Sequence, residues 1–160
     1  MIINTIKPHK IPERLIYTKG DTSQIFSTKT GIVLGKINTE ITTLRDKSFY
    51  PNHKGFTSLY IRNLHVKPAF RNSGVGTQLT QFAQYLSKKQ GAEGRIHLIA
   101  YNPDHPADAP HKFYRKRGFV TTSKKHNELI DFAIEQNIPI PPFLTQGIPM
   151  YLKNYWKKIK

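Results

Sequence analysis

The sequence predicts a single α/β domain built around a mixed β-sheet. Its 160 residues match the usual size of one domain, and 38% hydrophobic residues are enough for one core. Between residues 56 and 122 the hydrophobic pattern indicates strand, helix, strand, helix, strand. Because this order joins neighbouring strands through a helix, it predicts a right-handed crossover. No internal repeat or low-complexity tract divides the chain, so residues 1–160 are expected to form one domain.

The first strands are predicted from runs of β-branched and apolar residues. Residues 24–27 and 32–41 are such runs, and Lys29-Thr30-Gly31 between them suits a tight turn. The two runs are therefore expected to form a hairpin. A longer strand is predicted from residue 56 to residue 66.

A helical pattern begins directly after Gly74. Apolar residues then recur at helical spacing, and Gly91 is placed to end the helix. The residues of this apolar stripe are Val75, Leu79, Phe82, Ala83 and Leu86. Further along, the pattern predicts a buried strand at 95–101, a short helix at 110–117 closed by Gly118, a strand at 119–122, a helix at about 128–136 and a strand at 148–152.

The composition excludes several classes of site. The chain has no cysteine, which rules out disulfides, thiolate metal sites and a cysteine nucleophile. Its seven histidines are scattered and no pair has the spacing of a zinc-binding helix, so no metal site is predicted. There is no apolar run of roughly 18 residues and no signal-peptide pattern. A cytoplasmic protein without a membrane span is therefore expected.

The charge balance indicates an anionic partner. The formal net charge is +15, which exceeds what solubility requires. The last residues alternate lysines with aromatic residues, which is typical of a nucleic-acid or membrane surface patch, although a solubilising tail would look the same. These residues are Tyr151, Lys153, Tyr155, Trp156, Lys157, Lys158 and Lys160. RNA or another polyanion is thus a candidate partner, and the oligomeric state stays open, a dimer included.

The segment Arg71-Asn72-Ser73-Gly74-Val75-Gly76 has the features of a phosphate-binding turn. Two glycines allow close approach of the backbone, and a helix start offers unpaired N–H groups and a positive dipole end. A dinucleotide fingerprint would need a third glycine at Leu79, and a Walker loop would need Gly-Lys-Ser/Thr, which is absent. A glycine loop that caps an ordinary helix is the alternative interpretation.

The residues around this turn resemble the GCN5-related N-acetyltransferase (GNAT) superfamily. The first motif is Leu64-x-Val66-x-Pro68-x-Phe70-Arg71-x-x-Gly74-Val75-Gly76-x-x-Leu79. The second motif follows at the right distance and is Phe113-Tyr114-x-x-x-Gly118-Phe119. The resemblance covers residues 56–122, and it extends to the flanks 1–55 and 123–160 only by extrapolation.

The resemblance implies acetyl-coenzyme A as cosubstrate, without a metal. It implies that the sheet splits between the strands at 56–66 and 95–101 and that the pantetheine arm lies in the gap. Backbone groups of Leu64 and Val66, on a strand that carries a bulge in the family, would bind this arm. An N–H group near Val66 would polarise the acetyl carbonyl, as an oxyanion donor does.

The resemblance also implies which residues bind the phosphate groups of the coenzyme and a role for Asn102. The turn from Arg71 to Gly76 would hold the pyrophosphate. Asn102 resembles the asparagine that ends the family's fifth strand. Lys116, together with Arg115 and Arg117, lies on the helix beside the coenzyme, within reach of its 3′-phosphate, and solvated surface is the alternative for these cations.

Acetyl transfer to an amine requires a group that protonates the departing thiolate and a base that removes the amine proton. Tyr114 matches the family's acid, and a core aromatic is the alternative. The strand at 60–66 has no carboxylate, so His65 is the best substitute for a base. Asp104, His105 and Asp108 in the following loop, or a water chain, are alternatives.

Three departures from the family concern the acceptor side. Only residues 7–20, with Pro8 and Pro12 among them, replace the family's two N-terminal helices, and one short helix is expected there. The loop between Asn102 and Tyr114 is longer than usual. The insert of roughly 25 residues before residue 148 is expected to rebuild part of the missing cleft wall.

The expected function is direct transfer of an acetyl group from acetyl-coenzyme A to an amine in a ternary complex. The acceptor is a small amine, a peptide or protein amine, or an aminoacyl group on RNA. The alternative is a non-catalytic module that binds coenzyme A or nucleic acid through its basic surface. The absence of a strand carboxylate favours this module, whereas the intact turn and Tyr114 favour the enzyme.

Overall fold

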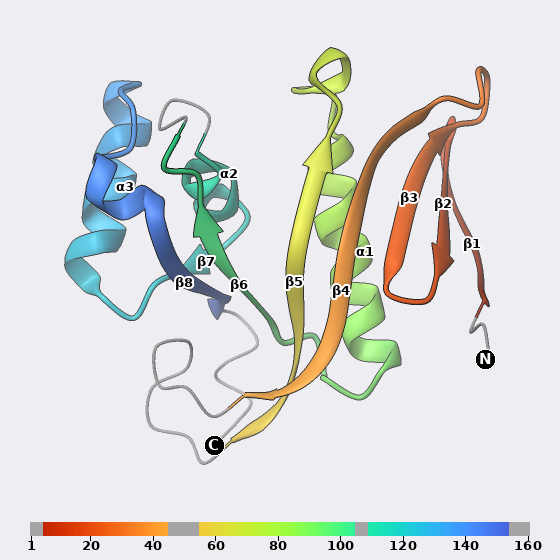
Figure 1. Cartoon of the computed structure of the whole chain (residues 1–160), viewed down its shortest axis with the longest axis horizontal. Helices are drawn as coiled ribbons and strands as arrows, with labels where there is room; N and C mark the ends of the chain where they lie inside the picture. Colours follow the sequence, from red (N-terminus) through yellow and green to blue (C-terminus); the bar gives the residue numbers. More distant parts are fainter. Residues whose placement is uncertain (1–4, 45–54, 105–108, 154–160) are drawn as a thin grey trace.

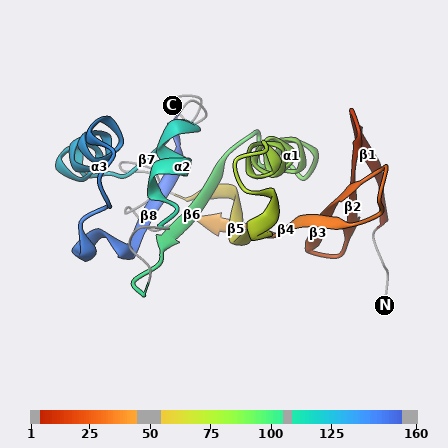
Figure 2. The same cartoon turned by 90° about the horizontal axis from the view of Figure 1, so that it is seen from above.

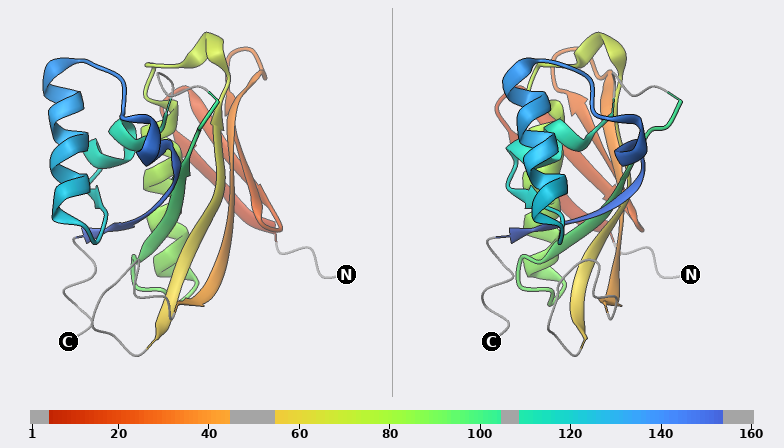
Figure 3. Two further views of the ribbon diagram at one scale, coloured as in Figure 1. Left: turned by 60° about the vertical axis from the view of Figure 1, so that its left-hand side comes forward. Right: turned by 90° about the vertical axis from the view of Figure 1, so that its left-hand side faces the viewer.

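The computed structural model describes residues 5–44, 55–104 and 109–153. In this part of the chain eight strands form one mixed sheet with the order β1-β2-β3-β4-β5-β6-β8-β7 (Figure 1). The helices α1 and α2 lie on the same side of the sheet (Figure 2), and α3 lies at the end of the molecule farthest from β1 (Figure 3). The prediction of a mixed sheet flanked by helices is confirmed.

The elements follow the predicted order from residue 22 onward, with ends that differ by a few residues. The strands are β1 (Thr5–Ile11), β2 (Arg14–Lys19), β3 (Thr22–Ser27), β4 (Val33–Leu44), β5 (Phe56–Val66), β6 (Ile96–Tyr101), β7 (Phe119–Val120) and β8 (Gln146–Leu152). The helices are α1 (Val75–Lys89), α2 (His111–Lys116) and α3 (Lys124–Gln136), with short 3₁₀ turns η1 (Pro68–Phe70) and η3 (Pro142–Thr145).

The expected short helix at residues 7–20 is wrong, because this segment forms β1 and β2. In β2 the buried Ile16 and Thr18 alternate with Tyr17, which is 47% exposed. This period of two belongs to a strand with one buried face, and a helix would have scattered these residues around its axis. Pro12 lies in the turn between the two strands, where a missing N–H group costs no ladder hydrogen bond.

The apolar stripe of α1 packs against β4 and β5 and forms the centre of the core. Its predicted residues are at most 2% exposed, and they are Val75, Leu79, Phe82, Ala83 and Leu86. The helix ends as predicted, because Gly91 follows the C-cap with a left-handed φ of 86°.

The strand β5 contains the bulge that the resemblance implied. Asn63 pairs with Asn38 of β4, but the next pair joins Ile61 to Thr39, so Arg62 has no partner of its own. One extra residue in a strand reverses which edge each later N–H group faces. The bulge therefore controls what β5 presents beyond Arg62.

The predicted split of the sheet lies between β5 and β6. These parallel strands pair only from Leu59 and Ile96 to Ile61 and Leu98. Beyond these pairs the two strands diverge toward the η1 end of the molecule (Figure 1).

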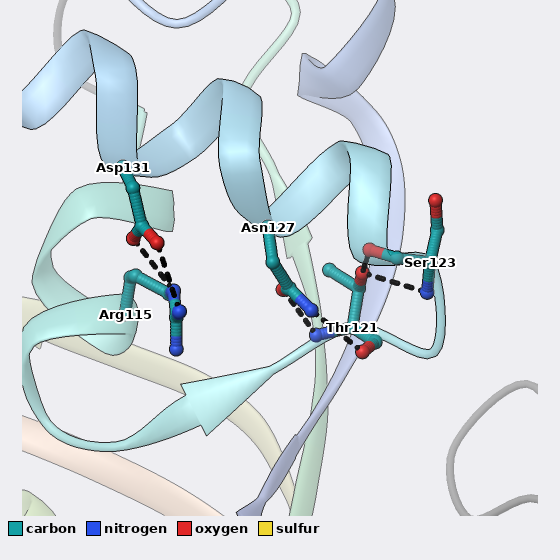
Figure 4. A network of polar contacts seen from close by, with 5 residues as sticks. All are labelled: Arg115, Thr121, Ser123, Asn127 and Asp131. Carbon is teal, nitrogen blue, oxygen red and sulfur yellow. Dashed lines mark hydrogen bonds and ion pairs between the residues drawn. The ribbon is translucent and has the colours of Figure 1, made fainter.

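The insert before β8 forms α3, which is anchored to its neighbours by polar contacts (Figure 4). The Ser123 hydroxyl caps the helix start, and the Asn127 amide bonds both the N–H and the carbonyl of Thr121 at 2.8 and 3.0 Å. Arg115 of α2 donates two hydrogen bonds to Asp131, at 2.8 and 2.9 Å. The helix α3 is therefore fastened to α2.

The expected rebuilding of the acceptor-side wall by this insert stays a prediction. The apolar side of α3, with Ile130 and Ala133 buried, packs on α2 and the core. No residue of α3 or η3 lines the cleft between β5 and β6 described below.

Candidate active site

A cleft of 790 Å³ opens where β5 and β6 diverge. It is bounded by the end of β5, the end of β6, the turn before α1, and α2. Apart from Ser73 and Val75, the predicted site residues all line it. The lining residues among them are Leu64, His65, Val66, Arg71, Asn72, Gly74, Gly76, Asn102, Tyr114 and Lys116.

The two exceptions support the turn from behind. The Ser73 hydroxyl donates a hydrogen bond to the Phe70 carbonyl, which closes the turn on itself. Val75 is 1% exposed and belongs to the core. Both residues therefore shape the turn without facing the cleft.

The turn has a backbone that few residues adopt. Asn72 and Gly74 have left-handed φ angles of 62° and 84°, and Gly74 occupies the N-cap position of α1. Asparagine and glycine are the residues that tolerate this region best. The first N–H groups of α1 lack helical partners, so the turn presents donors and a positive dipole end to an anion.

Gly76 lets α1 and α2 approach one another. A Cβ atom at this position would lie 3.1 Å from Cζ and 3.3 Å from Cε2 of Phe113, which is closer than carbon atoms normally pack. The two motifs recognised in the sequence thus come together at Gly76 and Phe113.

The N–H groups at the end of β5 point into the gap. Lys67, which follows β5, donates its N–H to the Leu34 carbonyl of β4 at 3.0 Å. Successive N–H groups of a strand face opposite edges, so those of Val66 and Leu64 face away from β4. They are therefore turned toward the cleft.

The bulge explains this direction. Before the bulge, the Leu59 N–H donates to the Arg95 carbonyl at 3.1 Å, so the N–H groups of the odd-numbered residues of β5 face β6. Beyond the extra residue Arg62, the N–H groups of the even-numbered residues face that side instead. Without it, the N–H of Val66 would face β4.

The basic residues of α2 and of its C-cap differ in what they contact. Arg115 is held by Asp131 and does not line the cleft. Lys112, Lys116 and Arg117 line it, and the Arg117 guanidinium lies 5.3 Å from the centre of the Phe113 ring. Of the three cations considered from the sequence, Lys116 and Arg117 thus lie at the cleft.

Tyr114 is 6% exposed and lies between two phenylalanines in edge-to-face contact. The centres of the Phe113 and Phe119 rings are each 5.3 Å from that of Tyr114. Burial raises the pKa of the Tyr114 hydroxyl well above its ordinary value of 10, because the phenolate would lose its hydration. At neutral pH this tyrosine carries its proton.

His65 is exposed at the rim of the cleft. The same residue lines a second hollow of 340 Å³, together with Gln24, Lys36 and Lys67. Of the alternative bases, Asp104 is exposed and does not line the cleft. His105 and Asp108 lie outside the described residues.

Two other histidines are buried away from the cleft. His97 is 4% exposed and its Nδ1 lies 2.8 Å from the Ser58 hydroxyl, while His111 is fully buried and its Nε2 lies 2.7 Å from the Leu144 carbonyl. Burial lowers the pKa of both imidazoles. Within the described ranges no three histidine or acidic side chains gather as metal ligands.

The comparison with protein families decides the identity of the fold. A family model for the acetyltransferase (GNAT) domain matches residues 28–121. The chain belongs to this family. The predicted superfamily and the predicted class of enzyme, an acetyltransferase, are thereby confirmed. No curated protein matches the chain significantly in sequence.

Solved structures share the fold of this GNAT domain at low identity. A bacterial toxin has a TM-score of 0.55 and 16% identity over 86% of this chain and 66% of its own, so the GNAT domain spans about two thirds of the toxin's length. Naa50 of Arabidopsis thaliana, solved with the bisubstrate analogue CoA-Ac-MVNAL, has a TM-score of 0.50 and 21% identity over 83% and 72%. The N-acetyltransferase YlbP of Bacillus subtilis, solved with coenzyme A, has a TM-score of 0.51 and 16% identity over 84% and 68%.

The structure adds residues that the motifs did not indicate. Thr77, Tyr101 and Lys112 also line the cleft of this GNAT domain. Arg14 of β2 contacts the turn itself, although it lies outside the family match. No sequence signal could have found Arg14, because its partners are 59 and 64 residues away.

Proposed function

We propose that this GNAT domain transfers the acetyl group of acetyl-coenzyme A directly to an amine while both substrates are bound. One observation carries the proposal. The glycine turn, the N–H groups at the end of β5 and the protonated Tyr114 all belong to one cleft.

Coenzyme binding uses three features of that cleft. The pyrophosphate lies at the start of α1, where unpaired N–H groups, the dipole and Arg71 act on the same anion. The pantetheine amides bond the free edge of β5 at Leu64 and Val66, in the way that a peptide adds to a sheet edge. Lys116 and Arg117 take the 3′-phosphate.

The reaction begins when the amine nitrogen attacks the thioester carbonyl carbon. The oxyanion accepts a hydrogen bond from the inward N–H of Val66. The carbon–sulfur bond then breaks, the nitrogen of the new amide releases its excess proton to solvent, and the thiolate takes the proton of the Tyr114 hydroxyl, which solvent later restores. Burial destabilises the charged thiolate as well as the charged phenolate, so both groups that exchange this proton are affected in the same direction.

The amine must lose its proton before it attacks. His65 takes this proton, because it is the imidazole on β5 that lines the cleft and it remains in contact with solvent. A water chain from the cleft to solvent serves the same purpose if His65 is too far from the amine.

Release of free thiol from acetyl-coenzyme A tests the proposal. Small amines, peptides and an aminoacylated RNA serve as acceptors, and calorimetry measures coenzyme binding in parallel. Acceptor-dependent thiol release supports the enzyme. Tight coenzyme binding without release on any acceptor would instead support a non-catalytic coenzyme-binding module.

A polyanionic acceptor such as RNA is the second part of the proposal. On the sheet face opposite α1, register pairs Tyr17 with Gln24, Gln24 with Lys36 and Lys36 with His65. Aromatic, amide and basic side chains thus form one row that ends at the cleft. Such a row suits stacked bases and phosphates, and the net charge of +15 attracts them.

Binding to single-stranded RNA tests this part. The affinity should fall with salt at a log–log slope of about −0.7 for each phosphate neutralised. Lys36→Ala should weaken binding, whereas Lys88→Ala, on the exposed side of α1, should not. If no RNA binds at about 50 mM salt, this acceptor class is wrong and the acetyltransferase proposal stands.

Three further predictions have no test in the structure. We propose one domain over residues 1–160, since strands before and after the family match join the same sheet. Cytoplasmic location stays a prediction, and the oligomeric state stays open, a dimer included. Among the described residues no helix is long and apolar enough to cross a membrane.

A further inference from the structure

The turn that binds the coenzyme is held from outside by an arginine of the N-terminal hairpin. The Arg14 Nη2 donates to the Ser73 carbonyl at 3.0 Å, and its Nη1 donates to the Gln78 side-chain oxygen. Gln78 is also the residue whose N–H bonds the Gly74 carbonyl, at 3.0 Å, in the first turn of α1. One guanidinium therefore bridges the middle of the turn and the first turn of the helix.

This contact fixes the direction of an N–H group. The Ser73 carbonyl and the Gly74 N–H belong to the same planar trans peptide and point in opposite directions. Because Arg14 holds the carbonyl, the N–H points away from Arg14, and Gly74 itself lines the cleft. A cation on the carbonyl also polarises the peptide and makes its N–H a stronger donor.

The backbone at this point needs such support. Gly74 and Asn72 both have left-handed φ angles, and the surrounding turn is exposed. Glycine at an exposed turn has wide conformational freedom, so its order must come from outside. The neighbouring carboxylate of Glu13 pairs with Lys29 at 2.9 Å, so it does not compete for the guanidinium.

We infer that Arg14 is a positioning residue for the coenzyme pyrophosphate and that it acts through the Ser73–Gly74 peptide. The inference rests on the proposed binding of acetyl-coenzyme A at the turn. It makes β2, which lies outside the family match, part of the coenzyme site.

The test compares Arg14→Ala, Arg14→Lys and the control Lys19→Ala. The control removes one exposed cation from the same strand and leaves the Glu13–Lys29 pair in place. Calorimetry with coenzyme A should show a loss of about 10- to 100-fold in affinity for Arg14→Ala. The loss should be smaller for Arg14→Lys, since an ammonium can bind one of the two acceptors, and absent for Lys19→Ala.

Two further readouts separate positioning from other roles. The KM for acetyl-coenzyme A should rise while kcat changes less than about 3-fold, because the turn binds a part of the coenzyme that does not react. Dephospho-coenzyme A should show the same loss as coenzyme A. A loss confined to coenzyme A would mean that Arg14 binds the 3′-phosphate, and this would overturn the inference.

The outcomes are distinguishable. If the wild-type chain does not bind coenzyme A, the proposed function itself fails. If the wild-type chain binds and Arg14→Ala binds equally well, only the role of Arg14 fails. If Arg14→Ala does not fold, Arg14→Lys decides, and unchanged affinity in that folded variant together with an unchanged KM would overturn the inference.

Discussion

Acid should weaken this protein through one buried histidine. His97 lies on β6 with its Nδ1 2.8 Å from the Ser58 hydroxyl and its ring stacked on Tyr60, 5.1 Å between centres. Only 4% of the residue is exposed. Burial lowers the pKa of His97 from its ordinary 6.5 to about 4, because the imidazolium would lose its hydration.

The sign follows from which state binds the proton. Below pH 6.5 the unfolded chain protonates His97, whereas the folded chain does so only near pH 4. The contribution of neutral His97 to the free energy of unfolding is therefore fully present above pH 6.5 and is lost as the pH falls toward 4. The full difference corresponds to about 3 kcal/mol, of which about 2 kcal/mol has been lost at pH 5.

Denaturant unfolding at pH 7.5 and pH 5 measures this loss in the wild type and in His97→Gln. Glutamine can keep a hydrogen bond to Ser58 but does not titrate. Other groups, including the buried His111, titrate in both proteins and cancel in the comparison. The wild type should lose about 2 kcal/mol more than the variant between the two pH values. Equal losses would refute the argument from burial.

Three other predictions concern the cleft. Tyr114→Phe should lower kcat about 10²- to 10⁴-fold and leave coenzyme affinity nearly unchanged, which calorimetry and thiol release would show together. Arg71→Ala should weaken coenzyme A binding roughly 10- to 150-fold by calorimetry, and unchanged affinity would remove Arg71 from the site. Gly76→Val should cost about 1–3 kcal/mol in unfolding free energy because its side chain meets Phe113. In contrast, Gln81→Ala on the exposed side of the same helix should change little.

The sequence predicts best where a local pattern and a local structure coincide. The period of α1 and its glycine end at Gly91 are properties of consecutive residues, and both are confirmed. The turn and the second motif were found the same way, yet their contact through Gly76 and Phe113 was not. That contact joins residues 37 positions apart, and no spacing rule in one sequence encodes it.

In the N-terminal segment the resemblance to the family leads to a wrong prediction of secondary structure. The family's helices predict a helix for residues 7–20, whereas the run Ile16-Tyr17-Thr18 consists of the β-branched and aromatic residues that strands prefer. Local propensity is the better guide here, because β2 pairs with β3 along six residues and buries one face. The contact of Arg14 with the turn depends on that pairing, since β2, beside β3, places the guanidinium at Ser73.

The replacement of N-terminal helices by strands also bears on the acceptor. The strands β2 and β3 are joined by the short turn at Gly20 and Asp21, and no described α-helix covers the sheet face opposite α1 (Figure 2). A small amine would need an enclosed pocket, because it has little surface from which to gain affinity. An open face instead suits an acceptor that extends well beyond its reacting amine and makes many weak contacts. The row that ends at His65 offers such contacts, and this supports our proposal of a macromolecular acceptor.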